Sequence, residues 1–153
     1  MLGFLSLKKT ILLTTIFSIS LKYVALITSL LSSVFILYLT HSFAQNSYEK
    51  GIEYRYQGVY DSSLYYLDTA LKEYEQQGHV AEIPFILLNR GKTYQLSQNY
   101  DLALADFLQA LSHCEKLGNA DGKMKSFVYL AEFYRHLNKY IEANKYLNLA
   151  EKL

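Results

Sequence analysis

The sequence contains a single cysteine, a single proline and no tryptophan among its 153 residues. Because Cys114 stands alone, no disulfide can form within the chain, and the fold must rest on an apolar core. Acidic residues are missing from the beginning of the chain, since all fourteen lie at or beyond Glu49, whereas residues 1–44 carry three lysines. The net charge of +1 therefore hides a basic leading segment and a mildly acidic remainder.

Signatures of catalysis are also missing. No glycine-rich phosphate loop follows a strand pattern, and no serine lies in a recognisable nucleophile elbow. His113, Cys114 and Glu115 are adjacent on a predicted helix, so their side chains point about 100° apart and do not converge on one metal ion. Paired carboxylates are interpreted as solvated helix faces: Glu73 with Glu75, and Asp101 with Asp106. We therefore predict no enzymatic activity, no cofactor and no metal site.

Nucleic acid is an unsuitable partner for this composition. Lysines of the mildly acidic part of the chain are dispersed among carboxylates, so they form no continuous basic track for phosphates.

Three segments spaced forty residues apart carry matching residues. The equivalent positions are Tyr54, Tyr94 and Tyr134; Tyr60, Tyr100 and Tyr140; Ser63, Ala103 and Ala143; Leu67, Phe107 and Leu147; and Ala70, Ala110 and Ala150. A fixed period of this size indicates stacked helical units, each of which buries its apolar face against a neighbour. Such a stack leaves an elongated surface open, which favours binding over catalysis.

Apolar spacing within one period is helical and leaves room for two helices. We predict helices over 45–57, 61–77, 80–97, 100–117, 120–137 and 140–153. Gly78 and Gly118 lie where a helix C-terminus needs a left-handed residue, and Asn99 and Asn138 lie in short turns. Pro84 falls about one turn into the third of these helices, where a missing amide donor costs little.

The second unit carries Leu87, Arg90, Gly91 and Tyr94, then Ala103, Phe107 and Ala110. This pattern resembles the tetratricopeptide repeat. The resemblance covers residues 45–153 and implies an all-α, right-handed α-solenoid of about three helix-turn-helix units, 45–79, 80–119 and 120–153, preceded by an N-terminal hydrophobic helix. The forty-residue period resembles the longer-helix branch found in bacterial regulators and sensors. The pairs Gly51 with Ser63, Gly91 with Ala103, and Ala131 with Ala143 are small enough to let the two helices of a unit approach closely.

Residues 1–44 form a separate segment with two competing interpretations. From Tyr23 to Leu39 the chain runs seventeen residues without a charge, near the lower limit for crossing a bilayer. Lysines before this run and none directly after it place the N-terminus in the cytoplasm and the repeats outside. Alternatively, the small residues Ser42 and Ala44, before Gln45, mark a signal-peptidase site. A third interpretation, an ordinary buried core helix, is less favoured.

Both main interpretations export the repeats. We therefore predict a location in the bacterial cell envelope. The protein is then either an inner-membrane protein with periplasmic repeats or, if it is cleaved after Ala44, a periplasmic or secreted protein.

In tetratricopeptide stacks the first helix of each unit lines a concave groove. Carried onto this sequence, the resemblance places these partner-binding residues in the groove: Tyr48, Ile52, Arg55, Tyr56, Asn89, Lys92, Gln95, Tyr129, Glu132, Arg135 and His136. The same face includes Glu49, Leu88, Leu96 and Val128. Aromatic rings beside amide and charged groups suit a peptide. The competing interpretation is that Tyr48, Tyr56 and Tyr129 only pack between units.

We predict an exported, membrane-tethered interaction module that binds a protein or peptide in its concave groove. The alternative is the extracytoplasmic sensory input region of a bacterial signalling receptor. The sequence ends at Leu153 inside the last predicted helix without a polar capping helix. That open end predicts self-association or a longer product.

Overall fold

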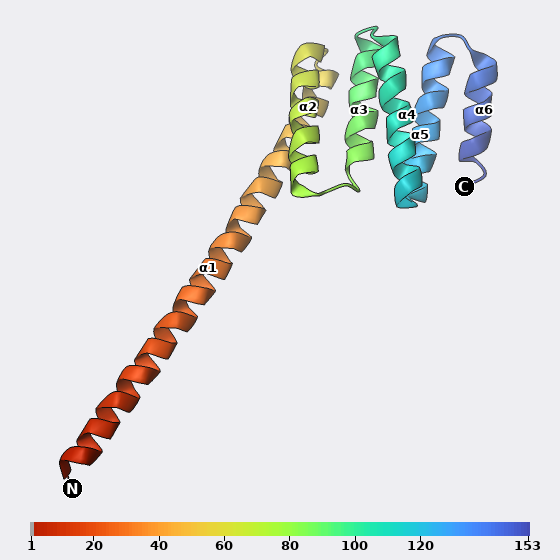
Figure 1. Ribbon diagram of the computed structural model, residues 1–153. Helices are drawn as coiled ribbons and strands as arrows, with labels where there is room; N and C mark the ends of the chain where they lie inside the picture. Colours follow the sequence, from red (N-terminus) through yellow and green to blue (C-terminus); the bar gives the residue numbers. More distant parts are fainter. Residues whose placement is uncertain (1) are drawn as a thin grey trace. The chain divides into compact units, whose positions relative to one another are not determined.

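The computed structural model describes the backbone of residues 2–153 and the side chains of residues 20–39, 42 and 46–153. The described secondary structure is entirely helical, as predicted (Figure 1). The helices are α1 (Leu2–Tyr56), α2 (Tyr60–Gln77), α3 (Ile83–Leu96), α4 (Tyr100–Leu117), α5 (Ala120–His136) and α6 (Tyr140–Ala150). The chain divides into two compact units, Met1–His41 and Ser42–Leu153, and the helix pairs of the predicted repeats lie in the second.

The helix predicted over 45–57 does not begin at residue 45, because it is the end of the continuous helix α1. Between Leu39 and Gly51 the sequence contains neither proline nor glycine, so nothing in this stretch ends a helix. The helix ends at Tyr56, two residues before Gly58, whose φ of 75° is left-handed.

Two further helix boundaries differ from the prediction by three residues. Helix α3 begins at Ile83 rather than at residue 80, and Pro84 lies in its first turn instead of one turn inside it. Proline restricts the residue before it, which favours a helix start at this point. Helix α6 ends at Ala150, so Leu153 lies beyond the helix and not inside it.

Left-handed residues end the helices at intervals of twenty residues. They are Gly58, Gly78, Gln98, Gly118 and Asn138, with φ between 58° and 75°. Gly78 and Gly118 have the conformation that their sequence positions predict. The amide after each left-handed residue donates to a carbonyl in the last turn of the helix, as Asn99 does to Tyr94 at 2.8 Å. Helix ends of this kind place the turns at regular intervals along the chain.

The two helices of a unit approach closely at a glycine. A methyl group added to Gly51 would lie 2.6 Å from Leu67, and one added to Gly91 would lie 2.7 Å from the ring of Phe107 and 3.1 Å from the Ala103 carbonyl oxygen. Ring and backbone leave no room for a side chain at Gly91. The predicted close approach is present, although Phe107 is a nearer obstacle than Ala103.

The core of the second unit lies between consecutive helices. Its principal cluster contains Ile83, Leu87, Leu88, Ala103, Phe107, Ala110, Leu130 and Phe133. At the repeated large position, Leu67 and Phe107 are fully buried, whereas Leu147 is 43 % exposed. In the first two units this side chain is covered by the first helix of the next unit. The α6 face around Leu147 has no such cover within the described chain.

Helices α2 to α6 stand side by side in chain order (Figure 1). Each packs against the next, and α3 also contacts α5. Among these five helices no contact joins α2 with α4, or α4 with α6. The first helices of the second and third units, α3 and α5, therefore approach each other more closely than the second helices do. The face made by the first helices is the inner face of the stack.

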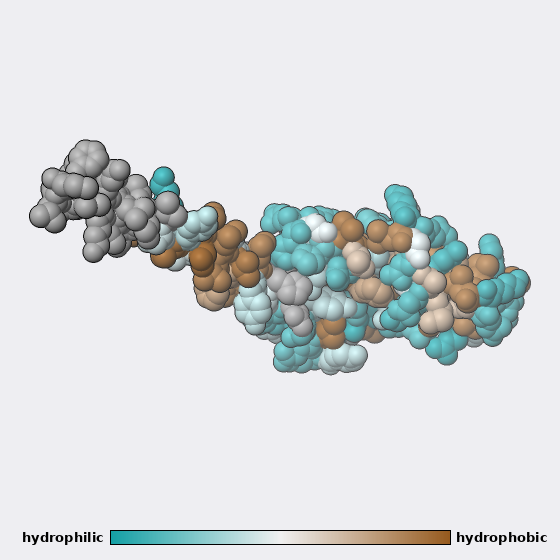
Figure 2. Space-filling view, turned by 90° about the horizontal axis from the view of Figure 1, so that it is seen from below, coloured by the Kyte–Doolittle hydropathy of each residue, from teal (hydrophilic) through white to brown (hydrophobic). Residues whose placement is uncertain are grey.

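In the first compact unit, Ser20–Leu39 is long and apolar enough to cross a membrane. Its side chains are exposed, and Figure 2 shows the apolar ones gathered along this segment. A signal sequence near the N-terminus can also be this long and apolar. The predicted cleavage site at Ala44 and Gln45 and the leading lysines Lys8 and Lys9 have side chains outside the described residues.

Candidate functional site

A polar hollow of about 410 Å³ opens on the inner face. Its lining comes from three helices: Lys92 and Gln95 from α3; Glu132, Arg135 and His136 from α5; and Tyr140 from α6. Five of these residues were predicted for the groove, and Tyr140 was not. Tyr140 is 58 % exposed at the start of α6, next to the turn that follows α5. In the sequence, Tyr140 occupies a position repeated every forty residues, and this position alone does not predict that its side chain is exposed.

A second hollow, of about 270 Å³, adjoins the first and is more apolar. Its lining consists of Arg55 and Tyr56 from α1, Lys92 and Leu96 from α3, and Tyr129 and Glu132 from α5. Tyr56 is 81 % exposed, and the Arg55 guanidinium lies 5.2 Å from the centre of its ring. Tyr129 is half-buried against Phe107, with ring centres 5.7 Å apart. Tyr129 thus packs between units and also lines the hollow, whereas Tyr56 is free of the core.

An ion pair separates the two hollows. The Lys92 ammonium lies 3.1 Å from the Glu132 carboxylate, and both residues line both hollows. The two side chains remain 28 % and 46 % exposed, so water screens their attraction. The pair joins equivalent positions of the second and third units. Its exposure makes it a contact that a charged ligand can replace.

Hydrogen bonds of Asn89 link it to two other predicted groove residues, Tyr48 and Arg55. Asn89 donates to the Tyr48 hydroxyl at 2.7 Å and to the Phe85 carbonyl at 2.8 Å, and its side-chain oxygen accepts from Arg55 at 2.8 Å. Burial is the main cause that raises the pKa of Tyr48 to about 12. Both amide donors of Asn89 are therefore used, one by Tyr48 of α1 and one by a carbonyl within α3.

The remaining residues of the predicted face divide between the interior and the surface. Leu88 is 2 % exposed and belongs to the core, contrary to its predicted place on the groove face. Ile52 is half-buried and lines neither hollow. Gln95 is 5 % exposed, and its side-chain oxygen has no hydrogen-bond partner among the described residues. Helix α3 lies between three other helices, so it buries more of its circumference than an amphipathic pattern predicts.

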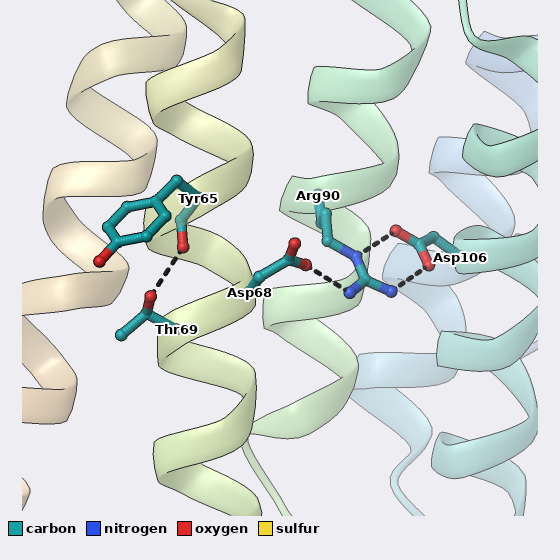
Figure 3. Close-up of polar contacts among 5 residues, drawn as sticks. All are labelled: Tyr65, Asp68, Thr69, Arg90 and Asp106. Atoms are coloured by element: carbon teal, nitrogen blue, oxygen red, sulfur yellow. Dashed lines mark hydrogen bonds and ion pairs between the residues drawn. The ribbon is translucent and has the colours of Figure 1, made fainter.

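Arg90 connects three helices away from the groove lining (Figure 3). Its guanidinium donates to both carboxylate oxygens of Asp106 on α4, at 2.8 and 2.7 Å, and to Asp68 on α2 at 2.7 Å. Hydrogen bonding to Asp106 is the main cause that raises the pKa of Arg90. The prediction that Asp106 lies on a solvated face is wrong, because its side chain is 6 % exposed. Its position three residues after Ala103 and four before Ala110 is the signal that places it on the buried face.

Cys114 is fully buried, and burial raises the pKa of its thiol. A methyl group added to Gly122 would lie 2.6 Å from its sulfur, so the thiol fills a close contact between α4 and α5. In the described part of the chain, no group of three or more His, Cys, Asp or Glu side chains is arranged to hold a metal ion. These observations fit a packing role for Cys114.

Residues 82–153 match the sequence model of the tetratricopeptide repeat family. The matched segment comprises helices α3 to α6, the second and third units of the stack. No curated protein matches the chain. The first unit lies outside the match but has the same close contact at Gly51 and the same left-handed turn at Gly58. Together, the family match and the repeated helix pairs support the identification of this chain as a tetratricopeptide repeat protein.

Proposed function

We propose that this chain is an exported, membrane-tethered module of the long-period bacterial repeat type, which binds a peptide or protein partner on the inner face of its helix stack. The observation that carries the proposal is the pair of adjoining hollows, lined by side chains from α1, α3, α5 and α6. Side chains from three units meet there, although they are distant in the sequence. A ligand in this position would contact all three units at once.

The chemistry of the lining suits a peptide. Tyr56 and Tyr129 offer rings, and Arg55, Lys92 and Arg135 offer hydrogen-bond donors beside them. Tyrosine and arginine are the residues that most often dominate peptide and protein interfaces, because they combine apolar area with polar groups. A peptide ligand needs polar groups to bind its backbone and apolar area to bind its side chains.

The test compares two triple variants of the full-length chain in detergent. The groove triple, Tyr56, Lys92 and Arg135 to alanine, removes one lining side chain from each unit. The control triple, Lys72, Gln109 and Lys145 to alanine, removes exposed side chains of the second helices. Each variant is subjected to the same selection from a random peptide display library, and the affinities of enriched peptides are measured.

We expect the groove triple to lose binding while its helicity, measured by circular dichroism, is unchanged. Truncation of a central aromatic or arginine anchor commonly costs about 2 kcal/mol or more, which is about thirtyfold in affinity. Equal losses in the two triples, or no loss in the groove triple, would assign binding to another face.

The proposed location rests on the exposed apolar helix over Ser20–Leu39 and on the lysines that precede it. In intact bacterial cells, a protease admitted to the periplasm should digest the repeats and spare a tag placed before Lys8. Mass spectrometry separates the two forms, because an N-terminus at Gln45 means cleavage and an intact leading segment means an anchor. Protection of the repeats would contradict export.

A further inference from the structure

We infer that the two hollows together bind an internal, extended peptide segment that carries an apolar side chain close to an acidic one, and that Glu132 competes with the acidic side chain for Lys92. The inference rests on the proposed function and specifies the partner. The apolar side chain would occupy the hollow beside Tyr56, Leu96 and Tyr129. The acidic side chain would occupy the hollow beside Lys92, Arg135 and His136.

Charge complementarity identifies the acidic group. The residues that line the hollows include three lysine and arginine side chains, Arg55, Lys92 and Arg135, and one carboxylate, Glu132. Residues 45–153 as a whole carry twelve basic and fourteen acidic side chains, so the lining is a local reversal of the charge of its surroundings. Such a reversal attracts an acidic segment to the inner face and repels a basic one.

The lining of the more apolar hollow indicates that the ligand carries an apolar side chain near its acidic one. Its walls include the exposed ring of Tyr56, the half-buried ring of Tyr129 and the 44 % exposed side chain of Leu96. Both hollows share Lys92 and Glu132, so the two ligand side chains must lie near each other along the segment. In an extended peptide, alternate side chains point to the same face and satisfy this requirement.

The hollows favour an internal segment over a chain end. Their lining runs from α1 to α6, across all three units, so a segment can pass through. The acidic group in the polar hollow is therefore assigned to an aspartate or glutamate side chain.

Glu132 has a distinct role in this arrangement. Its carboxylate lies 3.1 Å from the Lys92 ammonium, the position that a ligand carboxylate would need. The ligand must displace Glu132 from Lys92, and the displaced charge then repels it at short range. Removal of this carboxylate should strengthen binding, whereas removal of a merely structural ion pair could only weaken or preserve it.

The experiment uses the full-length chain in detergent and fluorescent, C-terminally amidated peptides. Each peptide has a glycine and serine background with one leucine or phenylalanine and one glutamate, at every separation from adjacent to five residues apart. A matched set replaces glutamate by glutamine, and a third set leaves the C-terminal carboxylate free. Fluorescence anisotropy measures the affinities of the parent, Glu132→Gln and Asp121→Asn. Asp121 is the control, because it also pairs with a lysine, Lys125, at 2.7 Å, but lines neither hollow.

We expect glutamate peptides to bind about fivefold more tightly than their glutamine counterparts, a difference that decreases with added salt. Glu132→Gln should strengthen binding of glutamate peptides about threefold and leave glutamine peptides nearly unchanged. Asp121→Asn adds the same unit of net charge and should have no comparable effect.

Equal binding of glutamate and glutamine peptides, a Glu132→Gln variant that binds no more tightly than the parent, or binding that requires a free C-terminal carboxylate would each overturn the inference. The same holds if no peptide of the panel binds saturably. The proposed function fails separately, when the groove triple and the control triple behave alike in selection from the random library. A library peptide without acidic residues that depends on the groove triple would refute the inference and leave the proposed function standing.

Discussion

Asp106 and Asp68 offer a matched test of how burial sets the strength of an ion pair. Both carboxylates lie 2.7 Å from an Arg90 nitrogen, but the Asp106 side chain is 6 % exposed and that of Asp68 is 45 % exposed. Asp106 also accepts a second hydrogen bond, from Arg90 Nε at 2.8 Å. Asp106→Asn keeps the size of the side chain, removes the charge and loses at least one of the two bonds.

The expected cost follows from these contacts. A hydrogen bond to a charged group contributes about 1.5–3 kcal/mol, and the loss of charge weakens the bond that remains. Arg90 keeps Asp68 and is 17 % exposed, so it is not left as an unpaired buried charge. We therefore expect Asp106→Asn to lower the free energy of unfolding by about 2–3 kcal/mol. Asp68→Asn, at an exposed pair, should stay within about 0.5 kcal/mol of the parent.

Thermal unfolding followed by circular dichroism measures the difference, and about 2 kcal/mol corresponds to a fall in Tm of about 10 °C for a domain of this size. Replacing both partners, with Arg90→Met and Asp106→Leu, should restore most of the stability, because no buried polar group is then left unsatisfied. The reasoning is refuted if Asp68→Asn is as damaging as Asp106→Asn, or if the double variant is less stable than both single variants.

Three further tests concern the packing, the turns and the pH dependence. Gly91→Leu should lower the free energy of unfolding by about 1–3 kcal/mol, because even its first carbon meets Phe107; an unchanged Tm would contradict the close pairing of α3 with α4. Gln98→Gly should raise the free energy of unfolding by about 0.5–1 kcal/mol, since Gln98 has a φ of 64°, while Gln98→Ala should not. The pKa of Tyr48 is about 12 in the folded protein and 10.0 in the unfolded chain. The stability that comes from the protonated Tyr48 hydroxyl is therefore complete below pH 10 and is lost between pH 10 and 12. Tyr48→Phe should reduce the alkaline fall in Tm over that interval, and an identical fall in parent and variant would refute the assignment.

The fold could be predicted from the sequence because it depends on local, repeated signals. Left-handed glycines, small residues at close contacts and apolar residues at helical spacing recur every forty residues, and each has a direct structural meaning. The predicted helix start at residue 45, which was wrong, lacked any such signal. Without glycine or proline before Gly51, the end of the apolar segment and the first repeat helix form one continuous helix.

The candidate site was less predictable because it depends on how side chains from different units pair. Sequence position placed Tyr48, Arg55 and Asn89 on the inner face, but their mutual hydrogen bonds follow only from the distance between α1 and α3. Asp106 was assigned to solvent because its partner, Arg90, lies sixteen residues away on another helix. Whether the lining residues bind a partner stays a prediction.

The contact of each helix with its immediate neighbours also has a mechanical consequence. From α2 to α6 each helix packs against the next, so bending strain divides into small rotations at successive helix contacts. The inner face, where α3 meets α5, shortens or lengthens most as the curvature changes. A change in curvature would therefore alter the spacing of Lys92 and Glu132, which lie on these two helices.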